Sequence, residues 1–157
     1  MSLSKTPPQI VDFLAGKGFA VAGVSRNPQQ PANTIFRRLR DTGYPVFPIN
    51  PNAEEVEGTR CFPDLASIGQ PVDRVVIVTH PRAALNVVRQ CAEQGVRQVW
   101  FHRSFGPGSV SREAIAECEA RGITHIDGGC PMMFCEPVDL AHRCVKWWLQ
   151  RRGRVPA

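Results

Sequence analysis

The chain has 157 residues, 43% of them hydrophobic, which suits one ordinary globular domain and leaves no room for a second. It contains no run of about eighteen apolar residues, and Met1–Pro8 lacks the apolar centre of a signal peptide, so a cytoplasmic protein without a membrane span is expected. The formal net charge is +5, but the arginine clusters at 37–40 and 151–154 carry no interleaved aromatic residues or known motif, so nucleic-acid binding is not expected. A small polyanionic ligand remains compatible with this charge.

The N-terminal part predicts a short helix followed by a buried strand. Thr6-Pro7-Pro8-Gln9 has the pattern of a capping box, which predicts a helix over 6–16 that ends at Gly16 or Gly18. The run 19–24 is almost continuously apolar, as expected of a strand that is covered on both faces in a parallel sheet.

The next segment predicts a helix and then two less regular strands. Apolar side chains at i, i+3, i+4 and i+7 form one helical stripe that stops at Gly43: Ala32, Ile35, Phe36 and Leu39. A second strand follows at 44–49, where Pro45 and Pro48 each remove a hydrogen-bond donor. A third, short strand is expected near 60–62.

The second half of the chain continues the alternation. A fourth strand at 74–78 is followed by a helix that Pro81 opens and Gly95 ends. The remaining elements are expected as strand 96–101, helix 111–121, strand 123–126 and a last helix over about 138–152. The last helix places five residues on its apolar side: Ala141, Cys144, Val145, Trp148 and Leu149.

The cysteines are interpreted as reduced. Four of the six fall in apolar-periodic segments, where a free thiol behaves as a small hydrophobe: Cys61, Cys91, Cys118 and Cys144. Cys130, Cys135, His142 and Cys144 lack the pair spacing of a zinc site, so no metal is expected. Trp147 is expected to be exposed beside the last helix's apolar face, which suggests a surface for a protein partner or a second copy.

Strands that alternate with helices predict an α/β fold. We expect a Rossmann-like three-layer α/β/α domain over 1–157, with its core at 19–140 and a mainly parallel sheet of about five to six strands in the order 3-2-1-4-5-6. In that order the first strand lies beside the fourth, and ligands bind at the carboxyl ends of these two strands.

Four loops should meet at that edge of the sheet, namely 23–28, 50–52, 78–81 and 101–103. In the first loop a small residue, Gly23, lets the backbone approach a phosphate, Ser25 offers a hydroxyl and an N–H, and Arg26 adds a full charge. The alternative is an ordinary strand-to-helix loop in which Gly23 serves packing alone.

The dinucleotide-binding fingerprint is missing. The first loop lacks G-x-G-x-x-G, and no acidic residue follows the second strand before Glu54, so the ribose contact that NAD requires has no candidate. The chain also has no G-K-[ST] sequence for a P-loop. Both absences disfavour NAD and nucleoside triphosphates as ligands.

Three ordered motifs carry a family resemblance: Val21-Ala22-Gly23-Val24-Ser25, Gly43 to Pro51, and Val75 to Pro81. Together they closely resemble stand-alone CoA-binding domain proteins and are similar to the N-terminal CoA-binding domain of the succinyl-CoA synthetase α subunit. The resemblance runs from about Phe19 to Leu140 and implies coenzyme A or an acyl-CoA as the ligand.

The resemblance also implies roles for eleven residues. Those expected to hold the phosphates or lie along the nucleotide are Gly23, Ser25, Arg26, Asn50 and Pro51. Those expected to flank the adenine or pantetheine arm, or to follow it further, are Val78, Thr79, Pro81, Phe101 and His102. Asn33, at the start of the first crossover helix, either binds phosphate through its amide or caps the helix.

Catalysis is expected to be incomplete in this chain. The synthetases use a phosphohistidine on a further domain, for which this chain leaves no room, so we expect a non-catalytic carrier, sensor or subunit. Two alternatives stay open: an enzyme that acts on a CoA thioester through His102 or Cys130, and an NAD(H)-responsive regulatory module. Packing of Met132, Met133 and Phe134 under the last helix is the structural interpretation of the segment around Cys130.

Overall fold

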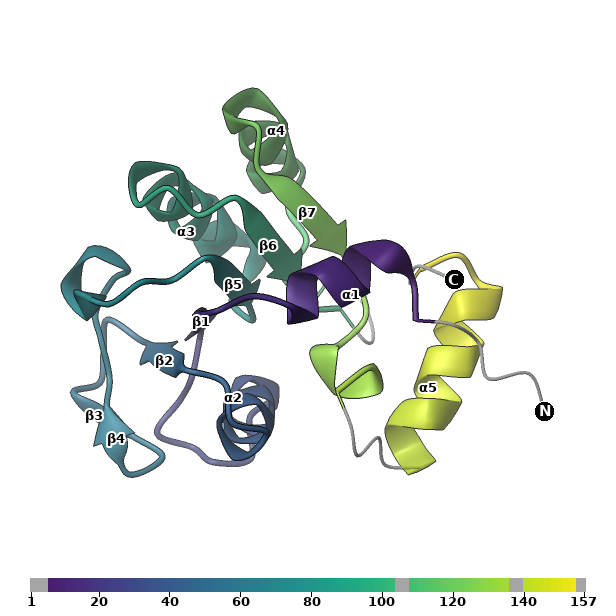
Figure 1. Ribbon diagram of the computed structural model, residues 1–157, viewed down its shortest axis with the longest axis horizontal. Coiled ribbons are helices and arrows are strands. Elements are labelled where there is room, and N and C mark those ends of the chain that lie inside the picture. Colours follow the sequence, from purple (N-terminus) through teal and green to yellow (C-terminus); the bar gives the residue numbers. More distant parts are fainter. Residues whose placement is uncertain (1–5, 104–107, 136–139, 155–157) are drawn as a thin grey trace.

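A computed structural model describes residues 6–103, 108–135 and 140–154 of the chain. Five strands form one parallel sheet in the order β2-β1-β5-β6-β7 (Figure 1). Their bounds are β1 Phe19–Ala22, β2 Val46–Ile49, β5 Arg74–Ile77, β6 Gln98–Phe101 and β7 Thr124–Asp127. The predicted Rossmann-like α/β fold is confirmed.

Alternation along the strands divides the core into two layers. The cross-strand row Val21, Val76, Trp100 and Ile126 faces one side of the sheet. The next row, which contains Ile77 and Phe101, faces the other side. Every residue of β1, which has a neighbouring strand on each side, is buried, which is why its sequence is apolar without alternation.

Helices cover both faces of the sheet, as Figure 1 shows. One face packs against α1 Pro8–Leu14, α2 Pro31–Asp41, the short 3-10 helix η2 Pro131–Met133 and α5 Leu140–Arg151. The other packs against α3 Pro81–Glu93, α4 Arg112–Arg121 and the 3-10 helix η1 Ala66–Ile68. None of the helices in the described ranges has the length and apolar character that crossing a bilayer requires.

The third predicted strand is reduced to one residue. Phe62 pairs with Ile49 in an isolated parallel bridge at the outer edge of β2, where a third strand would lie. Phe62 N–H donates to Pro48 O, but the ring nitrogen of Pro48 has no hydrogen to return to that edge. The preceding residues instead pair with each other, as an antiparallel hairpin of β3 Glu55–Val56 and β4 Thr59–Arg60.

The prediction of a capping box at Thr6 is wrong. Pro7 is the N-cap of α1, and no side chain caps this end of the helix. Pro7 is extended and precedes the helix, so the helix begins one residue later than a Thr6 cap would place it. It spans Pro8–Leu14 instead of 6–16. Its buried side chains are Ile10 and Phe13.

Of the five residues predicted on the apolar side of the last helix, three pack as predicted and one does not, while the side chain of Ala141 lies outside the described part of the structure. Leu149 is buried, and Val145 and Trp148 pack against the same cluster as Met132 and Met133. Cys144 is exposed, because it lies on the edge of the apolar stripe beside Arg143 and away from the cluster. Trp147 is 56% exposed, as predicted, and the Arg151 guanidinium lies 4.2 Å from its ring centre.

Candidate functional site

A cavity of about 380 Å³ lies at the carboxyl ends of β1, β2 and β5, the edge at which the strand order predicts a ligand. It brings together five of the residues that the sequence singled out: Gly23, Asn50, Pro51, Val78 and Thr79. They come from three loops that are far apart in the chain and meet because parallel strands end at the same edge.

The rest of the lining comes mainly from α3 and the turn that precedes it. Six lining residues were not among the expected site residues, although His80 lies in the predicted 78–81 loop: Pro63, His80, Ala83, Asn86, Val87 and Gln90. Asn86 and Gln90 are one helical turn apart, and this i, i+4 spacing from a helix that starts at the site was the available signal. Among the described residues, the lining contains no Asp, Glu, Lys or Arg, so the cavity offers neutral polar groups and apolar surface.

The Thr79 hydroxyl is a buried polar atom that has no hydrogen-bond partner among the described residues. Such atoms are rare in native proteins, since a buried hydroxyl without a partner loses its bonds to water. Thr79 is the second residue after β5 and lines the cavity, so the unpartnered hydroxyl belongs to a residue that a ligand there would contact.

His80 is the N-cap of α3 and is oriented by its own helix. Its Nδ1 accepts a hydrogen bond from Arg82 N–H at 3.2 Å. The neutral ring therefore carries its hydrogen on Nε2, which makes that nitrogen a donor. Pro81 occupies the first helical position, as predicted, but does not line the cavity.

Gly23 allows two strands to approach closely at the mouth of the cavity. Its φ is +104°, and a Cβ atom at this position would lie 2.2 Å from Val78 O. The packing interpretation of Gly23 therefore has a direct structural cause.

The loop after β1 uses its own polar groups internally. Asn33 Oδ1 accepts from Ser25 N–H at 2.8 Å, and Asn33 Nδ2 donates to Ser25 O at 2.7 Å. Asn27 N–H donates to Ser25 Oγ at 3.0 Å. The suggestion that Asn33 caps the helix is wrong, because Gln30 is the N-cap of α2 and the buried Asn33 amide binds the loop. Arg26 is exposed at the tip of this loop.

Asn50 joins the loops that follow β1 and β2. Its Nδ2 donates to Val24 O at 2.8 Å, and its Oδ1 accepts from Asn52 N–H at 2.8 Å. This second bond forms an Asx turn that directs the chain past Pro51.

A second hollow of about 650 Å³ adjoins the cavity and shares Pro51 and Pro63 with it. The exposed Arg60 lines this hollow, with its guanidinium 4.9 Å from the Phe62 ring centre. Cys61 also lines it, but burial raises the pKa of its thiol, so the thiolate is disfavoured at neutral pH.

Three residues that were considered for the pantetheine arm or for thioester chemistry lie outside the cavity lining: Phe101, His102 and Cys130. Phe101 is 0% exposed and packs in the core, because the alternation of β6 turns its side chain onto a face of the sheet. Cys130 is 3% exposed and belongs to the opposite core layer. His102 contributes a backbone N–H to Ile77 O, which extends the β5–β6 ladder.

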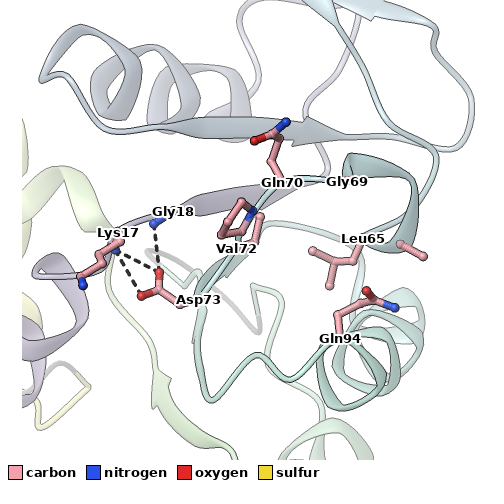
Figure 2. A pocket seen from close by; sticks show the side chains of 10 residues that line it. Lys17, Gly18, Leu65, Gly69, Gln70, Val72, Asp73 and Gln94 are labelled. Atoms are coloured by element: carbon pink, nitrogen blue, oxygen red, sulfur yellow. Dashed lines mark hydrogen bonds between the residues drawn. The ribbon is translucent and has the colours of Figure 1, made fainter.

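Another hollow, of about 470 Å³, lies at the amino ends of β1 and β5, and Figure 2 shows it from close by. The Asp73 carboxylate there accepts from Lys17 N–H and from Gly18 N–H, at 3.0 to 3.2 Å. These bonds join the segments that precede two neighbouring strands, so the Asp73 carboxylate has a structural role. The edge at which parallel α/β sheets bind ligands is the opposite one.

Relatives of the chain include stand-alone proteins and parts of larger enzymes. It is 30% identical over 94 residues to the ADP-forming acetate–CoA ligase II of Archaeoglobus fulgidus, a match that covers 59% of this chain and 14% of the ligase. It is 26% identical over 114 residues to the uncharacterized protein YneT of Bacillus subtilis, covering 73% of this chain and 82% of that protein. The solved structure of a hypothetical protein from Pyrococcus horikoshii has a TM-score of 0.77 at 29% identity, covering 86% of this chain and 93% of that one.

The fold, the cavity edge and these relatives agree with a match to a family model. The model described as "CoA binding domain" matches residues 17–136, which span the sheet, the three cavity-forming loops and the helices between them. The chain therefore belongs to the CoA binding domain family.

Proposed function

We propose that this chain binds coenzyme A, or a short acyl-CoA, at the carboxyl edge of β1, β2 and β5 and serves as a non-catalytic carrier, sensor or subunit. The observation that carries this proposal is the neutral cavity with the unpartnered Thr79 hydroxyl, which lies where the family resemblance expects the ligand. Membership of the CoA binding domain family supports the choice of ligand.

The ligand's parts match different parts of this edge. Adenine and the pantetheine amides are uncharged hydrogen-bonding groups, which suit a cavity lined by Asn50, Thr79, Asn86 and Gln90. The phosphates are anionic and require cations; Arg26 is exposed in the loop after β1, and the exposed Arg60 lines the adjoining hollow. The nucleotide end of the coenzyme is therefore assigned to this edge.

A role without catalysis is favoured by the surroundings of the two residues considered for chemistry. Cys130 is buried in the core layer opposite α3, and His102 is absent from the described lining of the cavity. The matched ligase is about seven times longer than the matched segment, since that segment covers 14% of it. We therefore do not propose that this chain carries out the complete ligase reaction by itself.

Calorimetric titration with CoA, 3′-dephospho-CoA and NAD tests the proposal. Saturable CoA binding without turnover of an acyl-CoA thioester supports a binding module. Thioester turnover would instead support the enzyme alternative, and tight NAD binding without CoA binding would refute the choice of ligand.

Ser25→Asp tests the placement of the phosphates. An Asp carboxylate can still accept from Asn27 N–H, as Ser25 Oγ does, so the loop should keep its shape while gaining a negative charge. We expect CoA affinity to fall about tenfold through charge repulsion. Ser25→Asn, which adds the same bulk without charge, is the matched control, and equal CoA affinity in Ser25→Asp and Ser25→Asn would refute the placement.

A further inference from the structure

The turn of the β3–β4 hairpin holds a residue in an unusual backbone conformation. Glu57 has a φ of +51°, and it is the non-glycine residue with positive φ among those described. This left-handed region disfavours residues that have a Cβ atom, and glycine or asparagine is the ordinary occupant. Gly58, the next residue, fits the usual pattern with a φ of +71°. The presence of a glutamate at this position therefore calls for a structural explanation.

The Glu57 carboxylate joins the hairpin to α2. Its Oε1 accepts from Arg37 Nη1 at 2.6 Å and from Asn33 Nδ2 at 2.7 Å. The side chain is 11% exposed, so solvent weakens these bonds less than it would on an open surface. Arg40 Nη1 also donates to Glu57 O at 3.1 Å, which holds the backbone of the turn.

Asn33 connects Glu57 to the loop after β1 by hydrogen bonds. The amide that donates to Glu57 also donates to Ser25 O and accepts from Ser25 N–H. With its orientation fixed at three points, the buried Asn33 side chain can present only one face to Ser25. Arg37 adds a parallel link, because the Nη1 that bonds Glu57 also donates to Pro28 O at the other end of the loop.

We infer that Glu57 is a positioning residue for coenzyme binding: through Asn33 and Arg37 it holds the 25–28 loop in the conformation that receives the phosphates. Glu57 does not line the cavity or the adjoining hollow, so it acts through other residues and not by contact. This role rests on the proposed coenzyme binding, and it explains why a glutamate occupies a glycine-like conformation.

Glu57→Gly separates this role from that of an ordinary turn residue. Glycine suits the backbone of the turn but removes every side-chain bond to α2. We expect the Ser25 amide to exchange its hydrogen about tenfold faster in the ligand-free protein, and CoA to bind about tenfold more weakly. Glu57→Gln, whose Oε1 can still accept from Asn33, should retain most of both properties.

Glu55→Gln is the matched control. It makes the same Glu-to-Gln change as Glu57→Gln, on the same hairpin, at an exposed position that lines neither the cavity nor the adjoining hollow. It should leave both Ser25 exchange and CoA affinity at the parent values.

Two results would overturn the inference. One is unchanged Ser25 exchange in Glu57→Gly, which would make Glu57 a turn residue only. The other is faster Ser25 exchange with unchanged CoA affinity, which would make the network structural without a role in binding. If the parent protein binds no CoA, the proposed function fails, and the exchange measurement alone decides whether Glu57 holds the loop.

Discussion

Individual side chains account for the chemistry of the cavity, and Thr79 is the most informative of them. Its hydroxyl is buried without a partner in the described structure, so it contributes a desolvation penalty to the ligand-free protein. A ligand acceptor or donor at this point would remove that penalty and contribute to affinity.

Thr79→Val should therefore have opposite effects on stability and binding. Valine has nearly the same shape and no hydroxyl, so we expect the free energy of unfolding to stay level or to rise by about 1 kcal/mol. CoA affinity should fall about fivefold to tenfold. Thermal unfolding and calorimetric titration measure the two effects, with Thr79→Ser as the control that keeps the hydroxyl. A less stable Thr79→Val with parental CoA affinity would contradict this account.

The cysteine thiols differ in exposure, so their rates of reaction with a thiol reagent should differ as well. Of the six cysteines, Cys144 is exposed and the other five are buried. Burial, followed by the charges of Asp127, Glu117 and Glu119, raises the pKa of Cys118 to about 12. At pH 8 we expect a thiol-specific chromogenic reagent to modify one thiol of the native protein rapidly and the others only after unfolding. Cys144→Ser should abolish the rapid phase, and a surviving rapid phase would contradict the placement of Cys144.

The same pKa shift implies a loss of stability in alkali. Cys118 has a higher pKa in the folded protein than its ordinary value of 9.0, so the folded state retains a proton that the unfolded state releases. Its contribution to stability is complete below pH 9.0 and is lost as the pH rises towards about 12. Cys118→Ala should reduce the slope of unfolding free energy against pH across this window, as measured by urea unfolding.

At the scale of elements, most of the fold follows from apolar patterns, and the exceptions have local causes. The apolar stripe of α2 and the continuous apolar run of β1 both consist of buried residues. Because burial selects apolar residue types, the sequence alone predicts both elements. The third predicted strand is reduced to one residue because its partner edge contains Pro48, whose effect depends on which side of β2 faces outward. Phe101 was assigned to the ligand although its position in β6 turns it to the core, a question of register that the run of apolar residues leaves open.

Two glycines form a matched pair: Gly23 lies where β1 and β5 end, and Gly43 lies in the turn between α2 and β2. Gly23 and Gly43 have φ values of +104° and +97°, but a Cβ atom at Gly23 would meet Val78 O, whereas nothing lies within 4 Å at Gly43. Gly43→Ala should cost about 1–2 kcal/mol for its backbone conformation alone. Gly23→Ala should cost about 1–3 kcal/mol more, because a carbonyl at the cavity mouth must move. Equal unfolding free energies for the two variants, measured by urea titration, would contradict the close approach of these strands.

For the whole molecule, the order of the strands decides where the site lies. Loops that start at Gly23, Asn50 and Val78 meet because β1 lies between β2 and β5, and the sequence predicted this neighbourhood through the fold class. The link from Ser25 through Asn33 to Glu57 was beyond prediction, because it depends on how the hairpin packs on α2. The sequence therefore indicated the three loops that line the cavity, together with a fourth, 101–103, that does not line it. The bonds within these loops depend on packing between distant elements.

The central claim is that coenzyme A occupies the carboxyl edge of the sheet and not the hollow at the amino edge. Amide chemical-shift mapping of the labelled protein during a CoA titration tests it most directly. We predict saturable shifts at Gly23, Ser25, Asn50 and Thr79, with Lys17, Gly18 and Gln94 unaffected. Shifts centred on Lys17, Gly18 and Gln94, or no saturable shift at all, would contradict it.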